Sequence, residues 1–362
     1  KTMMGQVGRN QASQLLHNKF VVVLGDSIQR SVYKDLVLLL QKDAYLTSSQ
    51  LKSKGELSFE NDCLVEGGRL GPMNNGTSYR EVRQYRTDHH LVRFYFVTRV
   101  FSPYMKSILA DFDHGLKPDL IIVNSCVWDV SRYSREWALE YRDNLCKFFV
   151  QLKNTLPEHS MVVWNMTMPL GKKLVGGFLV PEIQHVGPLL RFDVIEANFC
   201  GATLANEFGF DVLDMHFQFR FSLHLRTNDG VHWNAVAHRK MTCLMLEHAA
   251  QAWAVQLSNP AMQRGMESIS LWHCSGSVVD LFVLFKETLF TLIFGPGLKP
   301  EQPRQHNGFG PQFYVEDIPP PFTAGGDSSA PSWPVNNLVM KQKHRRPYNP
   351  YTREKPRYLY KN

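Results

Sequence analysis

The sequence predicts an α/β fold, with a parallel sheet that helices cover on both faces. Short apolar runs of strand length recur between residues 20 and 213, and segments of helical length separate them. Strands that alternate with helices in this way pair in parallel, because each helix returns the chain to the start of the next strand. The carboxyl ends of the strands then meet at one edge of the sheet, which is where such folds bind ligands.

The first expected unit is a strand that runs directly into a helix. Residues 20–24 are a continuous apolar run, and after Ser27 apolar residues recur near the helical period up to Leu40. Runs of apolar, β-branched or aromatic residues predict further strands at 93–101, 120–123, 161–164 and 210–213. Helices are expected at 134–153, 192–208 and 233–255.

The C-terminal part of the chain has a different composition. Twelve of the 20 prolines lie at or after Pro296, and residues 341–362 contain eight basic residues and one acidic residue, which is the whole formal excess of +7. Residues 296–362 therefore predict a disordered, Pro-rich basic tail. Because residues 1–340 are neutral, the basic balance is no evidence that the folded part binds nucleic acid.

The apolar segment 278–294 is too short to cross a membrane, and it contains Asp280, Lys286 and Glu287. We expect an amphipathic helical extension over residues 257–295 and no transmembrane segment. Polar residues precede the first expected strand, so no secretory signal is visible.

Six cysteines are scattered along the chain without a Cys-x-x-Cys pair. This usage is typical of a reducing compartment rather than of a disulfide framework or a metal site. We therefore expect an intracellular, cytoplasmic protein that needs no metal and no other cofactor.

Polar residues that can perform acyl-transfer chemistry follow the expected strands. Ser27 comes directly after the first strand and could act as a nucleophile, with His232 as its base and Asp229 orienting the imidazole. The backbone N–H of Ser27, the amide of Asn124 and a backbone N–H of Gly67 or Gly68 could form an oxyanion hole.

Each of these residues also has an ordinary structural interpretation. Residues 25–27, Gly-Asp-Ser, are a common turn or helix N-cap, and Asp229 with His232 could belong to a surface loop or helix cap. Asn124 could cap a strand end, and residues 67–68 could be a plain turn. Their joint occurrence at the expected places in an α/β order favours the catalytic interpretation.

These residues stand in segments that resemble a known superfamily. Residues 20–30 (FVVVLGDSIQR), the glycines at 67–68, Asn124 and residues 229–234 (DGVHWN) together resemble the SGNH, or GDSL-lipase, hydrolases. The pattern GDSxxR with DxVHW resembles more narrowly the PC-esterase branch. The likeness covers about residues 10–256, which we take as one domain.

The resemblance implies a flavodoxin-like three-layer α/β/α sandwich. It also implies Ser27 as nucleophile, His232 as base, Asp229 as orienting residue, and Gly68 and Asn124 as oxyanion donors. The third motif of the superfamily is Gly-x-Asn-Asp, whereas Asn124 here is preceded by Val and followed by Ser. The oxyanion loop is therefore expected to differ in geometry.

Four further residues are candidates for contact with a substrate: Arg30, Gly67, Trp128 and Trp233. Arg30 matches the arginine of the branch and could contact a sugar or other polar acyl acceptor, or could pair with Asp26 or another carboxylate. The two tryptophans could line the mouth of the site or pack in the core.

Two classes of function follow. The favoured one is a serine acyl-ester hydrolase or acyltransferase, acting on a small-molecule or glycan ester through an acyl-serine intermediate. The alternative is a catalytically inactive protein of the same fold that binds SH3- or WW-type partners or RNA through its tail. No DNA contact is expected in either case.

Overall fold

The computed structural model describes residues 7–71 and 79–257. The chain divides into two units, residues 1–261 and 262–362, and the described residues all belong to the first. The tail predicted at 296–362, and all but the first residue of the extension predicted at 257–295, lie outside the described residues.

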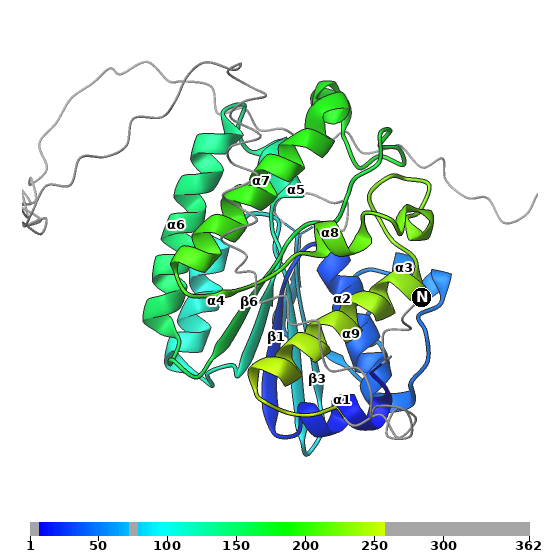
Figure 1. The fold of residues 1–362 in the computed structure, drawn as a ribbon, viewed down its shortest axis with the longest axis vertical. Coiled ribbons are helices and arrows are strands. Elements are labelled where there is room, and N and C mark those ends of the chain that lie inside the picture. The colour runs from blue at the N-terminus through cyan, green and yellow to red at the C-terminus, as the bar shows by residue number, and fades with distance from the viewer. Residues whose placement is uncertain (1–6, 72–78, 258–362) are drawn as a thin grey trace, which may run out of the picture. The chain divides into compact units, whose positions relative to one another are not determined.

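A seven-stranded sheet forms the centre of the described unit (Figure 1). Its spatial order is β2 (Cys63–Leu70), β3 (Arg80–Arg86), β4 (His90–Phe96), β1 (Lys19–Gly25), β5 (Leu120–Val123), β6 (Met161–Asn165) and β7 (Asp211–Leu213). The five strands from β4 to β7 pair in parallel, while β2 and β3 are antiparallel additions at one edge. Counted along the chain, the parallel strands have the flavodoxin-like order 2-1-3-4-5.

Helices cover both faces of this sheet (Figure 1). One layer contains α1 (Arg9–Leu15), α2 (Ser27–Lys42) and α9 (Ala235–Ala252), and the other contains α4 (Pro103–His114), α5 (Val127–Arg132), α6 (Trp137–Thr155) and α7 (Gly187–Glu207). Shorter elements complete the unit: α3 (Ser48–Lys52), η1 (Pro181–Val186), α8 (Met215–Phe219) and η2 (Leu223–Leu225). The predicted α/β fold is thus confirmed.

Strand β1 explains why the first apolar run is continuous. Its side chains alternate between the two faces, so Val21 and Val23 pack against the layer of α2 and α9, while Val22 and Leu24 pack against the layer of α4, α6 and α7. A strand that is covered on both faces has no solvent side, and every position from Phe20 to Gly25 is buried.

The parallel strands lie where the apolar runs predict them, with shifts of a few residues. The run at 93–101 begins earlier, at His90, and ends at Phe96. The sequence did not predict β2 or β3, because β3 reads Arg-Glu-Val-Arg-Gln-Tyr-Arg and its buried positions include Glu81 and Arg83. Such charged residues are rarely buried unless they are paired.

Among the helices of residues 7–71 and 79–257, none has the length and apolar character needed to cross a membrane. The five cysteines whose state the structure gives are free thiols: Cys63, Cys126, Cys146, Cys200 and Cys243. In the same part of the chain, no group of three His, Cys, Asp or Glu residues is arranged to hold a metal ion.

Candidate active site

The junction of β1 and α2 positions Ser27. Asp26 is the N-cap of α2, and its carboxylate accepts a hydrogen bond from the backbone N–H of Ile28 at 2.9 Å. Ser27 is therefore the first residue of the helix, beyond the carboxyl end of the central strand. Gly25 is required here because a Cβ atom would lie 2.3 Å from Cγ of Gln29.

Ser27, His232 and Asp229 form a row of hydrogen bonds. Oγ of Ser27 lies 2.8 Å from Nε2 of His232, and Nδ1 of His232 lies 2.7 Å from Oδ2 of Asp229. An imidazole that donates its Nδ1 proton to the carboxylate keeps a free lone pair on Nε2, which can accept the serine proton. The side chains of His232 and Asp229 are 39% and 30% exposed, so solvent and substrate can reach the row.

The loop that carries this pair is fixed by Asp229 itself. Its Oδ1 accepts hydrogen bonds from Oγ1 of Thr227 at 2.7 Å and from the backbone N–H groups of Val231 and His232 at 2.9 Å each. Burial alone would raise the pKa of Asp229, but these bonds and the His232 ring hold it below its usual range. Asp229 is therefore ionised and able to stabilise an imidazolium.

A second segment of backbone holds the same loop. The N–H of Gly171 donates to the carbonyl of Gly230 at 2.7 Å, and the N–H of Val175 donates to the carbonyl of Asp229 at 3.0 Å. Gly230 has φ +82°, and a Cβ there would lie 2.3 Å from the carbonyl oxygen of Lys173, so only glycine fits. Residues 171–175 thus set the position of His232.

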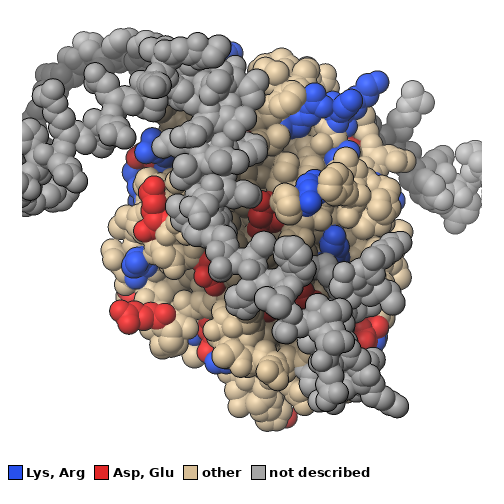
Figure 2. All heavy atoms as spheres, viewed as in Figure 1, with Lys and Arg blue, Asp and Glu red and all other residues tan. Residues whose placement is uncertain are grey.

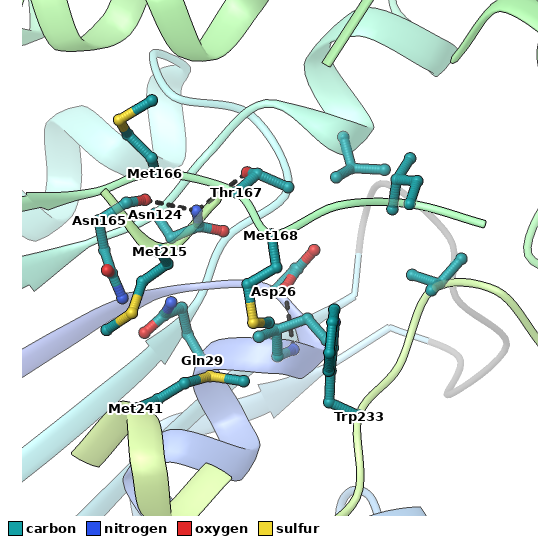
Figure 3. A pocket seen from close by; sticks show the side chains of 14 residues that line it. Asp26, Gln29, Asn124, Asn165, Met166, Thr167, Met168, Met215, Trp233 and Met241 are labelled. Atoms are coloured by element: carbon teal, nitrogen blue, oxygen red, sulfur yellow. Dashed lines mark hydrogen bonds between the residues drawn. The ribbon is translucent and has the colours of Figure 1, made fainter. Parts of the chain in front are cut away.

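The side chain of Asn124 lies at the end of β5, close to this edge of the sheet, and is 7% exposed. Its Nδ2 donates to the carbonyl of Asn165 at 2.7 Å and to Oγ1 of Thr167 at 3.1 Å (Figure 3). Both amide hydrogens are thus used inside the protein. An oxyanion would have to replace one of these two partners.

Gly67 and Gly68, the glycines of the family resemblance, lie in the edge strand β2. A Cβ at Gly68 would come within 2.4 Å of the carbonyl oxygen of Val65 and 2.6 Å of that of Val82, so the site requires glycine. The pairing of β2 with β3 shifts its register between Leu64 and Arg69, which marks an irregularity at these glycines. Gly67 belongs to the same irregular stretch.

The side chain of Arg30 is buried and contacts two residues on neighbouring strands. Its Nε and Nη2 lie 2.9 and 2.8 Å from Oε2 of Glu81, on β3, and its guanidinium covers the ring of Phe96. With 6% of its surface exposed, Arg30 pairs with a carboxylate in the structure. That carboxylate is Glu81 and not Asp26.

Both tryptophans are core residues. Trp128 is 6% exposed and packs edge-on against Phe178, with the guanidinium of Arg132 3.8 Å from the centre of its ring. Trp233 is 2% exposed and packs edge-on against Phe219. Each tryptophan thus packs in the core, and Trp233 also lines the small cavity beneath the junction of β1 and α2.

A small cavity of about 20 Å³ lies beneath the junction, between α2, α9 and the ends of β5 and β6 (Figure 3). Four methionines contribute to its lining: Met166, Met168, Met215 and Met241. Gln29 and Asn165 also line the cavity. Their buried amide oxygens, Oε1 and Oδ1, have no hydrogen-bond partner among the described residues. The volume suits one water molecule, which those oxygens could bind.

Sequence reasoning missed Gln29, Asn165 and Thr167. One signal was available for Asn165, because it ends β6 as Asn124 ends β5, and the two strands are neighbours. Nothing in the sequence marks Thr167, which follows the strand and meets Asn124 only in the folded chain.

The chain is similar to curated proteins over about two thirds of its length. PC-esterase domain-containing protein 1A of Homo sapiens is 58% identical over 250 residues, which are 68% of this chain and 55% of that protein. PC-esterase domain-containing protein 1B of Homo sapiens is 53% identical over 253 residues, which are 68% of this chain and 58% of that protein. The matched part of this chain belongs to the PC-esterase family. The chain spans a little over half the length of these relatives.

No family model matches the chain. Among solved structures, it is similar to Axe2, an acetylxylan esterase from Geobacillus stearothermophilus, with 12% identity and a TM-score of 0.38 over 70% of this chain and 100% of that one. It is also similar to a peptidoglycan O-acetylesterase, with 10% identity and a TM-score of 0.43 over 67% of this chain and 94% of that one. The PC-esterase family is thus established by sequence identity.

Proposed function

We propose that this PC-esterase family chain is a serine acyl-ester hydrolase or acyltransferase. The observation that carries the proposal is the row of two short hydrogen bonds that joins Ser27 to His232 and His232 to Asp229. A serine hydroxyl is a weak nucleophile, and a neutral imidazole within hydrogen-bond reach is the usual means of activating it.

In the proposed reaction, Oγ of Ser27 attacks the carbonyl carbon of the ester while Nε2 of His232 takes the hydroxyl proton. Asp229 stabilises the imidazolium that forms. The tetrahedral intermediate collapses as His232 returns the proton to the departing alcohol, which leaves an acyl group on Ser27. A water molecule then releases the acid, or another hydroxyl accepts the acyl group, with His232 again acting as base.

The negative charge of the tetrahedral intermediate needs hydrogen-bond donors. Ser27 is the first residue of α2, where a backbone N–H has no partner inside the helix and the helix dipole favours an anion. In this proposal Gly68 and Asn124 supply the other donors. Asn124 would exchange its longer bond, the 3.1 Å contact with Thr167, for the oxyanion.

The substrate class is an acyl ester of a small molecule or glycan. Whether water or a second hydroxyl takes the acyl group defines a hydrolase or an acyltransferase, and both use the same acyl-serine. Acetylated sugars and aryl acetates, which are simple members of this class, are the first substrates to test.

Labelling with a fluorophosphonate probe tests the proposal. We expect one adduct, located on Ser27 by mass spectrometry, and its loss in Ser27→Ala. Ser31→Ala is the matched control, because Ser31 lies one turn further along α2 and its hydroxyl donates to the Ser27 carbonyl at 3.2 Å. Labelling that persists in Ser27→Ala, or a folded wild-type protein that neither reacts nor cleaves an aryl acetate, would overturn the assignment.

A further inference from the structure

Exposed apolar side chains gather next to the loop that carries His232. On α8 and the segment that follows it, Phe217 is 51% exposed, Phe221 is 84% exposed and Leu223 is 43% exposed. Two phenylalanines so near each other in the chain, and this open to solvent, are unusual on a protein surface that meets only water.

A basic side chain contacts both phenylalanine rings. The guanidinium of Arg220 lies 3.3 Å from the centre of the Phe217 ring and 4.5 Å from that of Phe221, so it holds a positive charge between two exposed apolar groups. Lys172 and Lys173 are exposed on the neighbouring loop. Figure 2 shows Lys and Arg side chains gathered over this part of the molecule, at the upper right of the face drawn.

Hydrogen bonds join these segments around the catalytic candidates. The N–H of Val175 donates to the carbonyl of Asp229, which brings the lysine-bearing loop against the His232 loop. From the other side, the N–H of Asn234 donates to the carbonyl of Leu225, which follows the exposed phenylalanines. We name this surface the cationic aromatic rim, made of Lys172, Lys173, Phe217, Arg220, Phe221 and Leu223.

We propose that the cationic aromatic rim docks the protein on an anionic phospholipid surface. Exposed Phe and Leu side chains can enter the boundary between head groups and acyl chains, while Lys and Arg meet the phosphate and carboxylate charges above it. The charge of the rim is complementary to such a surface: residues 171–177 and 214–226 contain four Lys or Arg and one acidic residue, Asp214.

The combination favours lipid over a soluble acidic polymer. Phe217, Phe221 and Leu223 together give the rim an apolar part that a lipid layer can bury, whereas a soluble polyanion offers mainly charge to the basic groups. Docking through the rim would bring His232 and Ser27 to the surface of the lipid layer. This inference goes beyond the proposed esterase function, because binding to lipid does not require that Ser27 be reactive.

Co-sedimentation with vesicles tests the inference on the full chain in a Ser27→Ala background, so that the result does not depend on catalysis. Vesicles of phosphatidylcholine with phosphatidylserine are compared with vesicles of phosphatidylcholine alone. Lys172→Gln with Lys173→Gln should weaken binding to the anionic vesicles about 25-fold, since each basic residue contributes roughly fivefold near such a surface. Phe217→Ala with Phe221→Ala should weaken it at least about tenfold.

Matched controls come from helices α7, α3 and α6. Phe192→Ala with Ile195→Ala removes apolar groups that are 51% and 48% exposed on α7, and Lys52→Gln with Lys147→Gln removes two other exposed charges. The basic segment 341–362 is present in every variant, so it contributes equally to each comparison.

Two outcomes would overturn the inference. One is that the rim variants bind anionic vesicles as their controls do, with unchanged thermal midpoints. The other is that the lysine variant loses affinity for a soluble sulfated glycan while no variant affects vesicle binding, which would assign the rim to a glycan instead.

Discussion

Replacing Arg30 by Leu tests whether the arginine of the GDSxxR pattern stabilises the fold or binds a substrate. In the structure its guanidinium makes both of its close contacts with Oε2 of Glu81, and the two side chains are 8% and 0% exposed. Arg30→Leu keeps the apolar contact with Phe96 but leaves a buried carboxylate with one cation fewer. We expect a less stable protein in which the folded molecules still form the hydrogen bonds from Ser27 to His232 and from His232 to Asp229.

The expected magnitude follows from what remains around Glu81. Removing one partner of a buried ion pair typically costs about 3–5 kcal/mol. Glu81 keeps the hydroxyl of Tyr79 at 2.8 Å and Nη1 of Arg83 at 3.1 Å, so the loss should lie near the lower end, at about 3 kcal/mol. For a unit of this size that corresponds to a thermal midpoint lower by roughly 6–12 °C.

The pH dependence of the loss has a definite sign. Burial alone would raise the pKa of Glu81, and Arg30, Tyr79 and Arg83 hold it below its ordinary value. A carboxylate with a lowered folded-state pKa stabilises the protein above its unfolded pKa of about 4.5, and loses that contribution as the pH falls through the folded value. The deficit of Arg30→Leu should therefore be full at neutral pH and shrink in acid.

Urea and thermal unfolding of Arg30→Leu, Glu81→Gln and the double variant measure the interaction. Arg86→Leu is the control, because Arg86 is exposed on the same strand as Glu81. The double variant should lose less stability than the two single variants together. If Arg30→Leu instead kept its thermal midpoint and raised only the KM for an ester, Arg30 would bind substrate and the role argued from the structure would be wrong.

Three further predictions concern other positions. Asp229→Asn should lower kcat by up to about 10⁴-fold without unfolding the protein, because the imidazole loses the carboxylate that fixes its tautomer; undiminished turnover of an aryl acetate would contradict this. Burial raises the pKa of Asp129 to about 7, so the protonated carboxyl stabilises the protein fully below about pH 4 and this contribution is lost as the pH rises to 7. Asp129→Asn should therefore reduce the loss of stability between pH 4 and pH 7 by about 4 kcal/mol. Thermal midpoints that fall in parallel with pH for the variant and the wild type would refute this. Gly201→Ala should destabilise by about 1–2 kcal/mol, since its Cβ would lie 2.7 Å from Nε1 of the buried Trp164; an unchanged midpoint would show that the core relaxes.

The irregular edge of the sheet shows where sequence patterns fail. Strand β3 has the sequence pattern of a polar, exposed segment, yet Glu81 and Arg83 in it are buried. Burial becomes possible because Arg83 meets Asp62 at 2.7 Å and Glu81 meets Arg30, and these partners lie 21 and 51 residues away. A local pattern contains no information about such partners, so both edge strands were missed.

Asn124 illustrates the same limit within the candidate site. Its position after an apolar run places it at the right edge of the sheet. The two atoms that its amide meets belong to residues 41 and 43 positions further along the chain. Whether the Asn124 amide can bind an oxyanion therefore depends on its contacts with Asn165 and Thr167, and the local sequence around Asn124 does not encode these contacts.

The sequence by itself predicted the five parallel strands and the helices α2, α6, α7 and α9. It also predicted the two-sided burial of β1 and the position of Ser27 at a strand–helix junction. These features depend on residues two to four positions apart in the chain. The spacing of apolar side chains, every second residue in a strand and every third or fourth in a helix, therefore predicts them. Only the tertiary structure decided that Ser27 meets His232 across 205 positions, that Arg30 turns to Glu81, and that residues 171–175 hold the His232 loop. Those outcomes depend on how distant polar groups satisfy one another once water is excluded, because a buried charge or amide is stable only beside its partner.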